Sequence, residues 1–539
     1  MSSIAKSDNL SPSHPPAAGR REWIGLAVLV LACVVYAMDL TVLHLAVPSI
    51  SADLQPSGAQ LLWIIDIYGF MVAGFLITMG TLGDRIGRRR LLMIGAAGFS
   101  LTSLLAAFAQ TPDMLIMARA LMGISGATLA PSTLSLIFSM FLVPRQRSIA
   151  VGIWISGFSA GSAIGPMLGG LLLQNYWWGS VFLLALPVMI LLLILGPRLL
   201  PEFRNPQAGR LDLTSAFMSL AVILAVIFGL KEIAQDGLSA APLAFIVAGL
   251  ALGLAFVRRQ QQLEDPLIDP QLFRIPTFNV ALAVNLIAVF VAFGYFLFVA
   301  QYLQLVLGLT PLQAGLASLP SAVGFIVGSN VAPRFVHRVR PALVLAVGLG
   351  TAAASLLAMT RTSTESGLAI LIVSSVLNSL AMAPVITLTT ELIVGSAPPE
   401  RAGVASGISE TAAELGGALG IAVLGSLGMA VYRSQLARNL PANLPGEALA
   451  AAQDTLGAAI EFAGQLPAGL GAQLSQVSQQ AFVRGLHVVA LTSAVIALFA
   501  VGLVVFALRS PTVAASEWAA QPEAEREQRA AGIGALPGD

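Results

Sequence analysis

Apolar stretches long enough to cross a lipid bilayer recur along the whole chain, with short polar segments between them. A spanning helix needs about 20 predominantly apolar residues. Fourteen such runs are present, at 24–48, 59–81, 91–109, 113–141, 149–173, 178–199, 212–231, 240–257, 278–303, 312–333, 341–360, 366–393, 402–431 and 483–508. The pattern predicts an all-α polytopic membrane protein with 14 transmembrane helices. Because that number is even, both termini should lie on the same side.

The positive charges follow this predicted topology. All but six of the 28 Lys and Arg residues lie in the terminal segments or in loops on the same side as the termini. The exceptions are Lys231, Arg119, Arg361, Arg433, Arg438 and Arg484. Loops rich in Lys and Arg stay in the cytoplasm. We therefore expect both termini to be cytoplasmic and the protein to lie in the bacterial cytoplasmic (inner) membrane.

Composition excludes several classes of protein. Hydrophobic residues make up 57% of the 539 residues and charged residues 10%, far from the roughly 25% charged residues of soluble domains. The net charge of +1 says nothing about nucleic acid, but no basic patch is interleaved with aromatics, so we expect no nucleic-acid partner. Cys33 is the only cysteine and the four histidines are scattered, so neither a disulfide nor a metal site is expected. No catalytic constellation or nucleotide-binding loop is present, so we predict neither an enzyme nor a cofactor.

A weak internal repeat suggests the domain organisation. Pro144 and Arg147 recur as Pro398 and Arg401, and Ala130-Pro131 recurs as Ala383-Pro384 at nearly the same shift. Two related six-helix halves would explain both matches, and transporters built from parallel halves bind substrate between them. The predicted N-terminal half spans 23–200 and the C-terminal half 277–508, with two inserted transmembrane helices and their linkers between them at 201–276. A disordered cytoplasmic tail at 1–22 precedes them, and a cytoplasmic C-terminal tail follows at 509–539.

The connection at 432–481 is much longer than the others and should lie outside the cell. Its 446–462 part has helical spacing, and Leu466-Pro467 could form a turn. We expect an extracellular helical hairpin, with a flexible linker as the alternative.

Acidic residues inside the apolar runs are the strongest functional signal. Asp39 and Asp66 lie within predicted spans, where a carboxylate costs roughly 2.5–3.5 kcal/mol on insertion scales. Glu410 and Glu414 are four residues apart in one span and therefore share a helix face. Such acids usually line a polar pathway for protons, cations or both. The alternative is structural: the two aspartates could simply pair with Arg119, and Glu414 could be a buried hydrogen-bonding group.

Glu391, near the cytoplasmic end of the span at 366–393, could be an interfacial charge or part of the same pathway.

The loop after the second span carries a distinctive motif. It contains closely spaced glycines, one acid and several arginines, namely Gly80, Gly83, Asp84, Arg85, Gly87, Arg88, Arg89 and Arg90. Glycines allow a tight reversal, and an acid is favoured at a helix N-terminus. The motif resembles the signature loop of the major facilitator superfamily. In that family the loop is a cytoplasmic gate latch whose acid faces a helix end of the other half, here the span beginning near Ala402.

Three further stretches resemble the fourteen-helix drug:proton antiporters of that superfamily. They are Met38-Asp39-Leu40-Thr41-Val42 with Ala46-Val47-Pro48, the run from Arg119 to Gly126, and the glycine pattern of Gly157, Gly161, Gly165, Pro166, Gly169 and Gly170. Physically, glycines every four residues form a ridge for close helix approach, and packing is the alternative to function. Within the branch, Trp63–Tyr68 and Glu410–Gly416 most resemble the Qac-type quaternary ammonium compound and multidrug exporters.

Two positions depart from that resemblance. His44 stands where many relatives have asparagine. Phe325 stands where some Qac-type relatives carry an aspartate linked to divalent cations, which argues against strong export of bulky dications.

The resemblance implies a proton-coupled antiporter that exports lipophilic cationic drugs, dyes and quaternary ammonium antiseptics by alternating access. Proton coupling is assigned to Asp39 with Arg119. Substrate binding is assigned to acidic and aromatic residues, namely Asp66, Glu410, Glu414, Trp63, Tyr68, Phe70 and Phe293. We expect membrane lipids as the surroundings, the proton gradient as the energy source and a monomer as the working unit. A proton-coupled symporter or an exporter of a small metabolite is the alternative.

Overall fold

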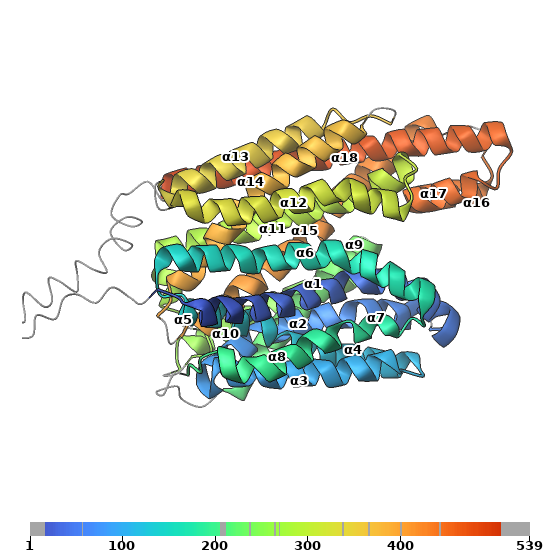
Figure 1. The fold of residues 1–539 in the computed structure, drawn as a ribbon. Helices are drawn as coiled ribbons and strands as arrows, with labels where there is room; N and C mark the ends of the chain where they lie inside the picture. Colours follow the sequence, from blue (N-terminus) through green and yellow to red (C-terminus); the bar gives the residue numbers. More distant parts are fainter. Residues whose placement is uncertain are drawn as a thin grey trace, which may run out of the picture.

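The computed structural model describes residues 17–56, 58–204, 212–236, 239–263, 266–268, 270–336, 339–364, 367–398, 401–440 and 444–507. Within these ranges every regular element is a helix, and the helices form two lobes that lie side by side (Figure 1). The predicted terminal tails lie almost entirely outside the described residues. Fourteen spans are long and apolar enough to cross a membrane, which confirms the predicted all-α fold and helix number.

The first lobe contains α1 to α8. Their bounds are α1 Arg20–Leu54, α2 Gly58–Ile86, α3 Arg88–Ala107, α4 Pro112–Gly126, α5 Leu129–Met140, α6 Pro144–Asn175, α7 Ser180–Leu183 and α8 Ala185–Leu199. One predicted span is divided into α4 and α5, where the Thr128 hydroxyl donates to the Ser125 carbonyl at 2.7 Å. Proline stands in the first turn of α4 and α6, a position where its missing N–H removes no helix hydrogen bond.

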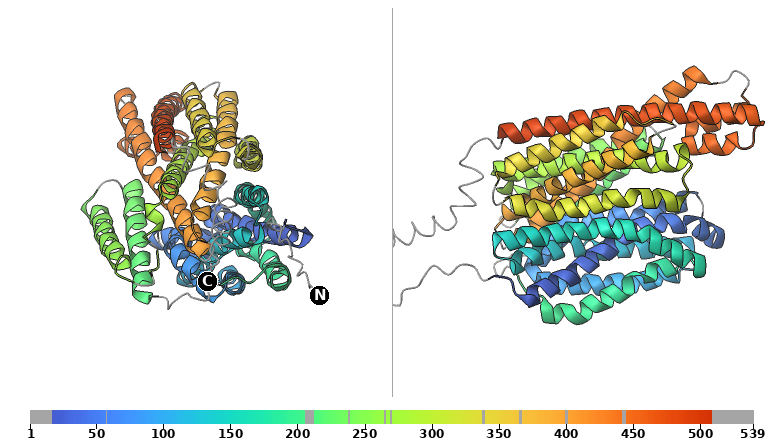
Figure 2. Two further views of the ribbon diagram at one scale, coloured as in Figure 1. Left: turned by 90° about the vertical axis from the view of Figure 1, so that its left-hand side faces the viewer. Right: turned by 45° about the horizontal axis from the view of Figure 1, so that its top comes forward.

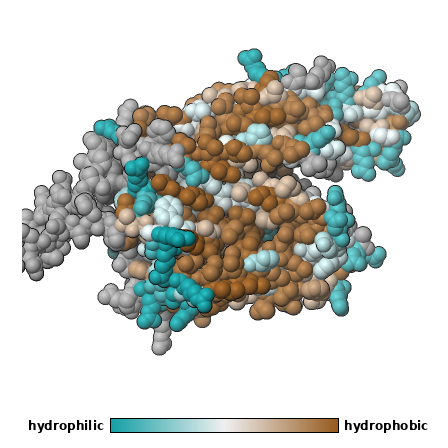
Figure 3. Space-filling model, in the orientation of Figure 1, coloured by the Kyte–Doolittle hydropathy of each residue, from teal (hydrophilic) through white to brown (hydrophobic). Residues whose placement is uncertain are grey.

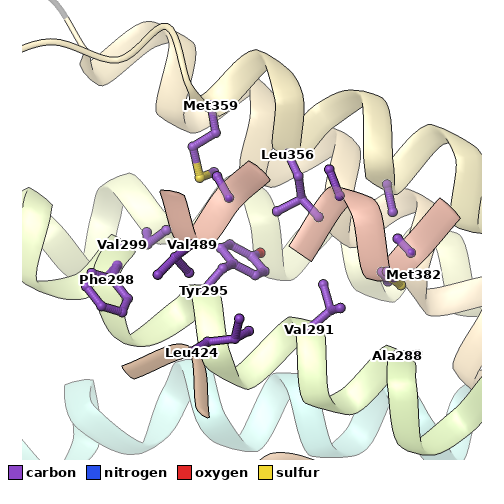
Figure 4. Close-up of a cluster of buried hydrophobic side chains, with 14 of the residues drawn as sticks. Ala288, Val291, Tyr295, Phe298, Val299, Leu356, Met359, Met382, Leu424 and Val489 are labelled. Atoms are coloured by element: carbon purple, nitrogen blue, oxygen red, sulfur yellow. The ribbon is translucent and has the colours of Figure 1, made fainter. Parts of the chain in front are cut away.

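The second lobe contains α11 to α18. Their bounds are η1 Leu272–Arg274, α11 Pro276–Gln301, η2 Tyr302–Val306, α12 Pro311–Val336, α13 Pro341–Met359, α14 Leu368–Gly395, α15 Ala402–Asn439, α16 Gly446–Asp454, α17 Leu456–Ala463 and α18 Ala468–Ala507. Each lobe has its own buried core. In the second, Tyr295 and Phe298 of α11 belong to one buried cluster with Leu356, Met382 and Leu424 from the surrounding helices (Figure 4). Between helices in lipid, this close packing supplies the main attraction.

Between the lobes in sequence come α9 (Leu213–Asp236) and α10 (Ala240–Gln260), which lie together on one side of the bundle (Figure 2). Helix α9 packs against α2 of the first lobe and α15 of the second. Phe70 and Ile227 are buried in this contact, and Ala418 packs against them. The inserted pair therefore covers the junction of α2 with α15.

The long connection of the second lobe is largely helical where it is described. Helix α15 continues to Asn439 and α18 already begins at Ala468, so both extend beyond the predicted spans. The expected 446–462 helix is divided at Thr455, whose hydroxyl accepts from the Ala458 N–H and so begins α17. The Tyr432 hydroxyl donates to the Ala452 carbonyl at 2.8 Å. This hydrogen bond fixes α16 against α15.

The surface matches a membrane environment. Large apolar side chains point outward from many helices, among them Phe217, Leu254, Phe499 and Phe506. Figure 3 shows a broad hydrophobic band along both lobes on one face of the molecule, with polar residues gathered toward the two ends. A soluble monomer rarely exposes such an area. The band is therefore the part of the protein that faces lipid.

Candidate functional site

A buried ion pair lies inside the first lobe. Arg119 of α4 donates from Nη1 to Oδ2 of Asp39 on α1 at 2.7 Å, and the two side chains are 1% and 11% exposed. Arg119 also donates from Nε to the Ile64 carbonyl at 3.2 Å. Its guanidinium lies 4.7 Å from the ring centre of Tyr68, a cation–π contact. Asp39 is also one of the residues that line a small cavity between α1 and the α7–α8 segment.

The predicted aromatic residues do not form a single cage in this conformation. Tyr68 and Phe70 are buried, and Phe70 packs against α9. Trp63 is 43% exposed with its ring edge-on to Phe70, whereas Phe293 is 54% exposed and borders Gly417. Only the backbone of Asp66, within α2, belongs to the described structure; its side chain lies outside it. The assignment of these residues to substrate binding stays a prediction.

The two glutamates of α15 face the first lobe. Tyr36 of α1 donates from its hydroxyl to Oε1 of Glu414 at 3.5 Å, the outer limit of a hydrogen bond. Glu410 interacts electrostatically with Glu414 on its own helix and with Cys33 and Tyr36 on α1. The acids of the second lobe therefore lie at its boundary with α1, the helix that carries Asp39.

Asp84 joins the two lobes near the end of α2. Its carboxylate accepts from the backbone N–H groups of Gly403 and Val404, both at 3.1 Å, in the first turn of α15. The positive end of the α15 dipole stabilises an anion there. Arg88 pairs with Asp84 at 2.9 Å and donates to the Ser135 carbonyl at 3.1 Å. These contacts close this end of the boundary between the lobes.

The other residues of this loop shape it and fix it within the first lobe. Gly80 has its α-carbon directly against the Gly403 backbone, where any side chain would overlap. Gly83 lies beside Leu91. Gly87 has φ +112, a conformation that favours glycine. Arg89 donates to the carbonyls of Pro197 and Leu200, and Arg85 also makes contacts.

Further polar contacts between lobes lie on α6. Ser148 donates to Glu391 of α14 at 2.5 Å, and the hydroxyls of Ser156 and Ser329 are 2.7 Å apart. Glu391 is 2% exposed, so it belongs to the boundary between the lobes rather than to the membrane surface. Together with Asp84, these bonds join the lobes near the end where α1 begins. The lobes separate toward the end that carries α16 and α17 (Figures 1 and 3).

The glycine ridge of α6 packs directly on α1. Gly157, Gly161, Gly165 and Gly169 face Val30, Val34, Met38 and Val42 in turn, one helical turn apart. Gly170 faces open space, and the side chain of Pro166 lies outside the described part of the chain. The ridge therefore sets the distance between α6 and the helix that carries Asp39.

Replacing Gly161 with alanine should destabilise the protein by about 1–3 kcal/mol, because the added methyl group would overlap the Val34 carbonyl. Gly170→Ala, on the same helix, should be neutral because nothing lies within 4 Å. Thermal unfolding of the two purified variants in detergent compares them. Equal melting temperatures would contradict the close approach of α1 and α6.

The sequence did not predict the contacts that Tyr36 makes across the boundary between the lobes. It also did not predict those of Ser148 and Ser156 on α6 and Ser329 on α12. A signal was present: Tyr36 is a polar-tipped residue within an apolar span, three positions before Asp39 and hence on a neighbouring face.

Two helical lobes that enclose buried charges within 14 membrane spans define a membrane transporter. The profile of the Major Facilitator Superfamily matches residues 29–421, and the chain belongs to this family. It is a transporter rather than an enzyme, and a multi-pass membrane protein.

Several curated relatives cover nearly the whole chain. The multidrug efflux pump LfrA of Mycolicibacterium smegmatis is 42% identical over 91% of this chain and 97% of its own length. The methyl viologen resistance protein SmvA of Salmonella typhimurium is 38% identical over 90% and 98%. The tetracenomycin C resistance and export protein of Streptomyces glaucescens is 33% identical over 94% and 96%. These bacterial relatives agree with a location in the inner membrane.

Solved structures share the fold at low sequence identity. The human organic anion transporter MFSD10 (TETRAN) has a TM-score of 0.59 at 16% identity, covering 91% of this chain and 100% of that one. A bacterial homologue of the human lysosomal transporter Spinster, in an inward-facing conformation, has a TM-score of 0.54 at 18% identity, with 92% and 100% covered.

Proposed function

We propose that this protein is a proton-coupled antiporter that exports lipophilic cationic drugs, dyes and quaternary ammonium antiseptics from the cytoplasm. The observation that carries the proposal is the arrangement of buried charges: the Asp39–Arg119 pair lies in one lobe, and Glu410 and Glu414 face α1 from the other. Carboxylates in a low-dielectric site can exchange a proton for a cation. The relatives are named for multidrug efflux, methyl viologen resistance, and tetracenomycin C resistance and export, which supports export.

The contacts between the lobes suggest the transport cycle. If the arginine-rich loops are cytoplasmic, as the positive-inside rule favours, the Asp84 contacts close the cytoplasmic side and the conformation is open outward. Protons from outside would then occupy the acids and release the drug. Rocking of the lobes would break the Asp84 contacts and expose the site to the cytoplasm, where loss of the protons restores cation binding.

Dications are a separate class of candidate substrates. One relative is named for resistance to methyl viologen, which is a small dication, whereas Phe325 replaces an acid of some Qac-type exporters. Phe325 is partly buried on α12 and packs against the first lobe. We include dications among the proposed substrates, with Glu410 and Glu414 as the two negative charges.

Drug-driven proton movement in inverted vesicles tests the proposal. Vesicles loaded with acid and a pH-sensitive dye should become more alkaline inside when ethidium is added, in a dose-dependent way, because each imported cation drives protons out. Protein-free vesicles are the control, and methyl viologen serves as the dication probe. No response to ethidium or to a panel of quaternary ammonium compounds would favour a symporter or a metabolite exporter instead.

A further inference from the structure

Tyr36 lies where the two lobes meet. It is 4% exposed on α1, and its ring packs edge-on against Phe158 of α6, with 5.8 Å between ring centres. Its hydroxyl reaches across the boundary to Glu414 of α15. A tyrosine hydroxyl in an apolar span needs a polar partner, and here that partner belongs to the other lobe.

Tyr36 is also connected, through Tyr68, to the buried Asp39–Arg119 ion pair. The rings of Tyr36 and Tyr68 are 6.2 Å apart, and Tyr68 carries the Arg119 guanidinium over its face. Tyr68 interacts electrostatically with Asp39, Arg119 and Glu414. Tyr36 and Asp39 are three residues apart on one helix, so a displacement of α1 at Tyr36 also moves Asp39 relative to α4.

Several titratable groups surround the Glu414 carboxylate. Glu410 lies on its own helix, Tyr36 lies on α1 and Tyr68 lies on α2, while Cys33 of α1 interacts with Glu410. Among these, the Tyr36 hydroxyl donates to Glu414, whereas a charged Glu410 repels it. A donor to a carboxylate favours its ionised form. Protonation of Glu414 therefore weakens one of the contacts between the lobes.

We propose that Tyr36 is a positioning residue that couples the protonation of Glu414 to the approach of the two lobes and, through α1, to the Asp39–Arg119 pair. The inference rests on the proposed proton-coupled antiport. It assigns to Tyr36 no contact with the drug.

Tyr36→Phe tests this role, because it keeps the ring and removes only the donor. Without the donor, a proton should occupy Glu414 at higher pH. The midpoint of the pH profile of ethidium-driven proton release should therefore move upward by about one pH unit. The matched control is Tyr432→Phe, because it removes another buried tyrosine donor, one that bonds the Ala452 carbonyl between α15 and α16 and takes no part in the proposed coupling. This control should keep the wild-type profile.

A double variant separates action through Glu414 from a general effect on structure. In a Glu414→Gln background, Tyr36→Phe should produce no further shift of the profile, since the acceptor no longer ionises. Additive shifts, an equal shift in Tyr432→Phe, or an unchanged profile in Tyr36→Phe would overturn the proposal. If the wild-type protein itself releases no protons in response to any drug, the proposed antiport fails first, and the two failures are thereby distinguished.

Discussion

Replacing Asp39 with asparagine should abolish drug-driven proton exchange, lowering its rate by about 100-fold or more. The asparagine amide cannot release or take up the proton that the carboxyl would exchange. It also leaves the guanidinium of Arg119, only 1% exposed, without its anion at 2.7 Å. Breaking a buried pair also costs about 3–5 kcal/mol of folding stability, so the amount of folded variant has to be measured beside its exchange rate.

The measurement is the vesicle assay with matched amounts of protein. Binding of ethidium to the purified variant, followed by fluorescence polarisation, shows whether the protein is folded and still recognises the drug. Asp113→Asn is a suitable control, because Asp113 lies exposed in the first turn of α4, where its carboxylate accepts a hydrogen bond from Gln60. Wild-type exchange by a correctly folded Asp39→Asn variant would refute the coupling role of Asp39.

Replacing Asp84 with asparagine should open the end of the bundle that the structure holds closed. The change removes the anion from the first turn of α15, where a favourable dipole contributes up to about 2 kcal/mol. It also removes the carboxylate that pairs with Arg88, whose side chain is 2% exposed. We expect the conformation with separated α2 and α15 ends to become dominant and transport to fall by about tenfold or more.

Labelling of a single cysteine would report this opening. In a Cys33→Ser background, Ser406→Cys places a thiol in the second turn of α15 at a fully buried position. A membrane-impermeant maleimide applied from the side where α1 begins should label it quickly after Asp84→Asn and slowly in the parent. Asp212→Asn, which changes an acid paired with Arg259 in another loop, should leave labelling slow. Equal labelling in all three proteins would show that Asp84 does not hold the lobes together.

The helix number and fold class were accessible from the sequence because each depends on local composition. A run of about 20 apolar residues satisfies its backbone only as a helix in lipid, and the fourteen predicted runs each correspond to a span of the structure. The boundaries of α15 and α18 were not accessible in this way. Helix α15 continues beyond the apolar stretch at its C-terminal end and α18 begins before it, because the polar residues of these extensions pack against α16 and α17.

The local motifs indicated which residues matter for function, but not which residues they contact. The sequence alone indicated that Asp39 and Asp66 are costly in a membrane and that Asp84 lies in a tight, arginine-rich loop. It left open whether Asp39 pairs with Arg119, because the two are 80 positions apart. The aromatic residues Trp63, Phe70 and Phe293 were grouped by type, yet the structure separates them into buried and exposed positions.

The sequence by itself thus determined that this protein is a bundle of transmembrane helices, similar to a transporter, with acidic residues inside its spans. Only the tertiary structure decided which acids meet which partners across the lobes. Tyr36 and Glu414 are 378 residues apart, and Ser148 and Glu391 are 243 apart. Helices surrounded by lipid are apolar on nearly every face, so no periodicity of apolar residues reveals which face packs inward. The contacts are set instead by close packing between the lobes and by the conformation in which they meet.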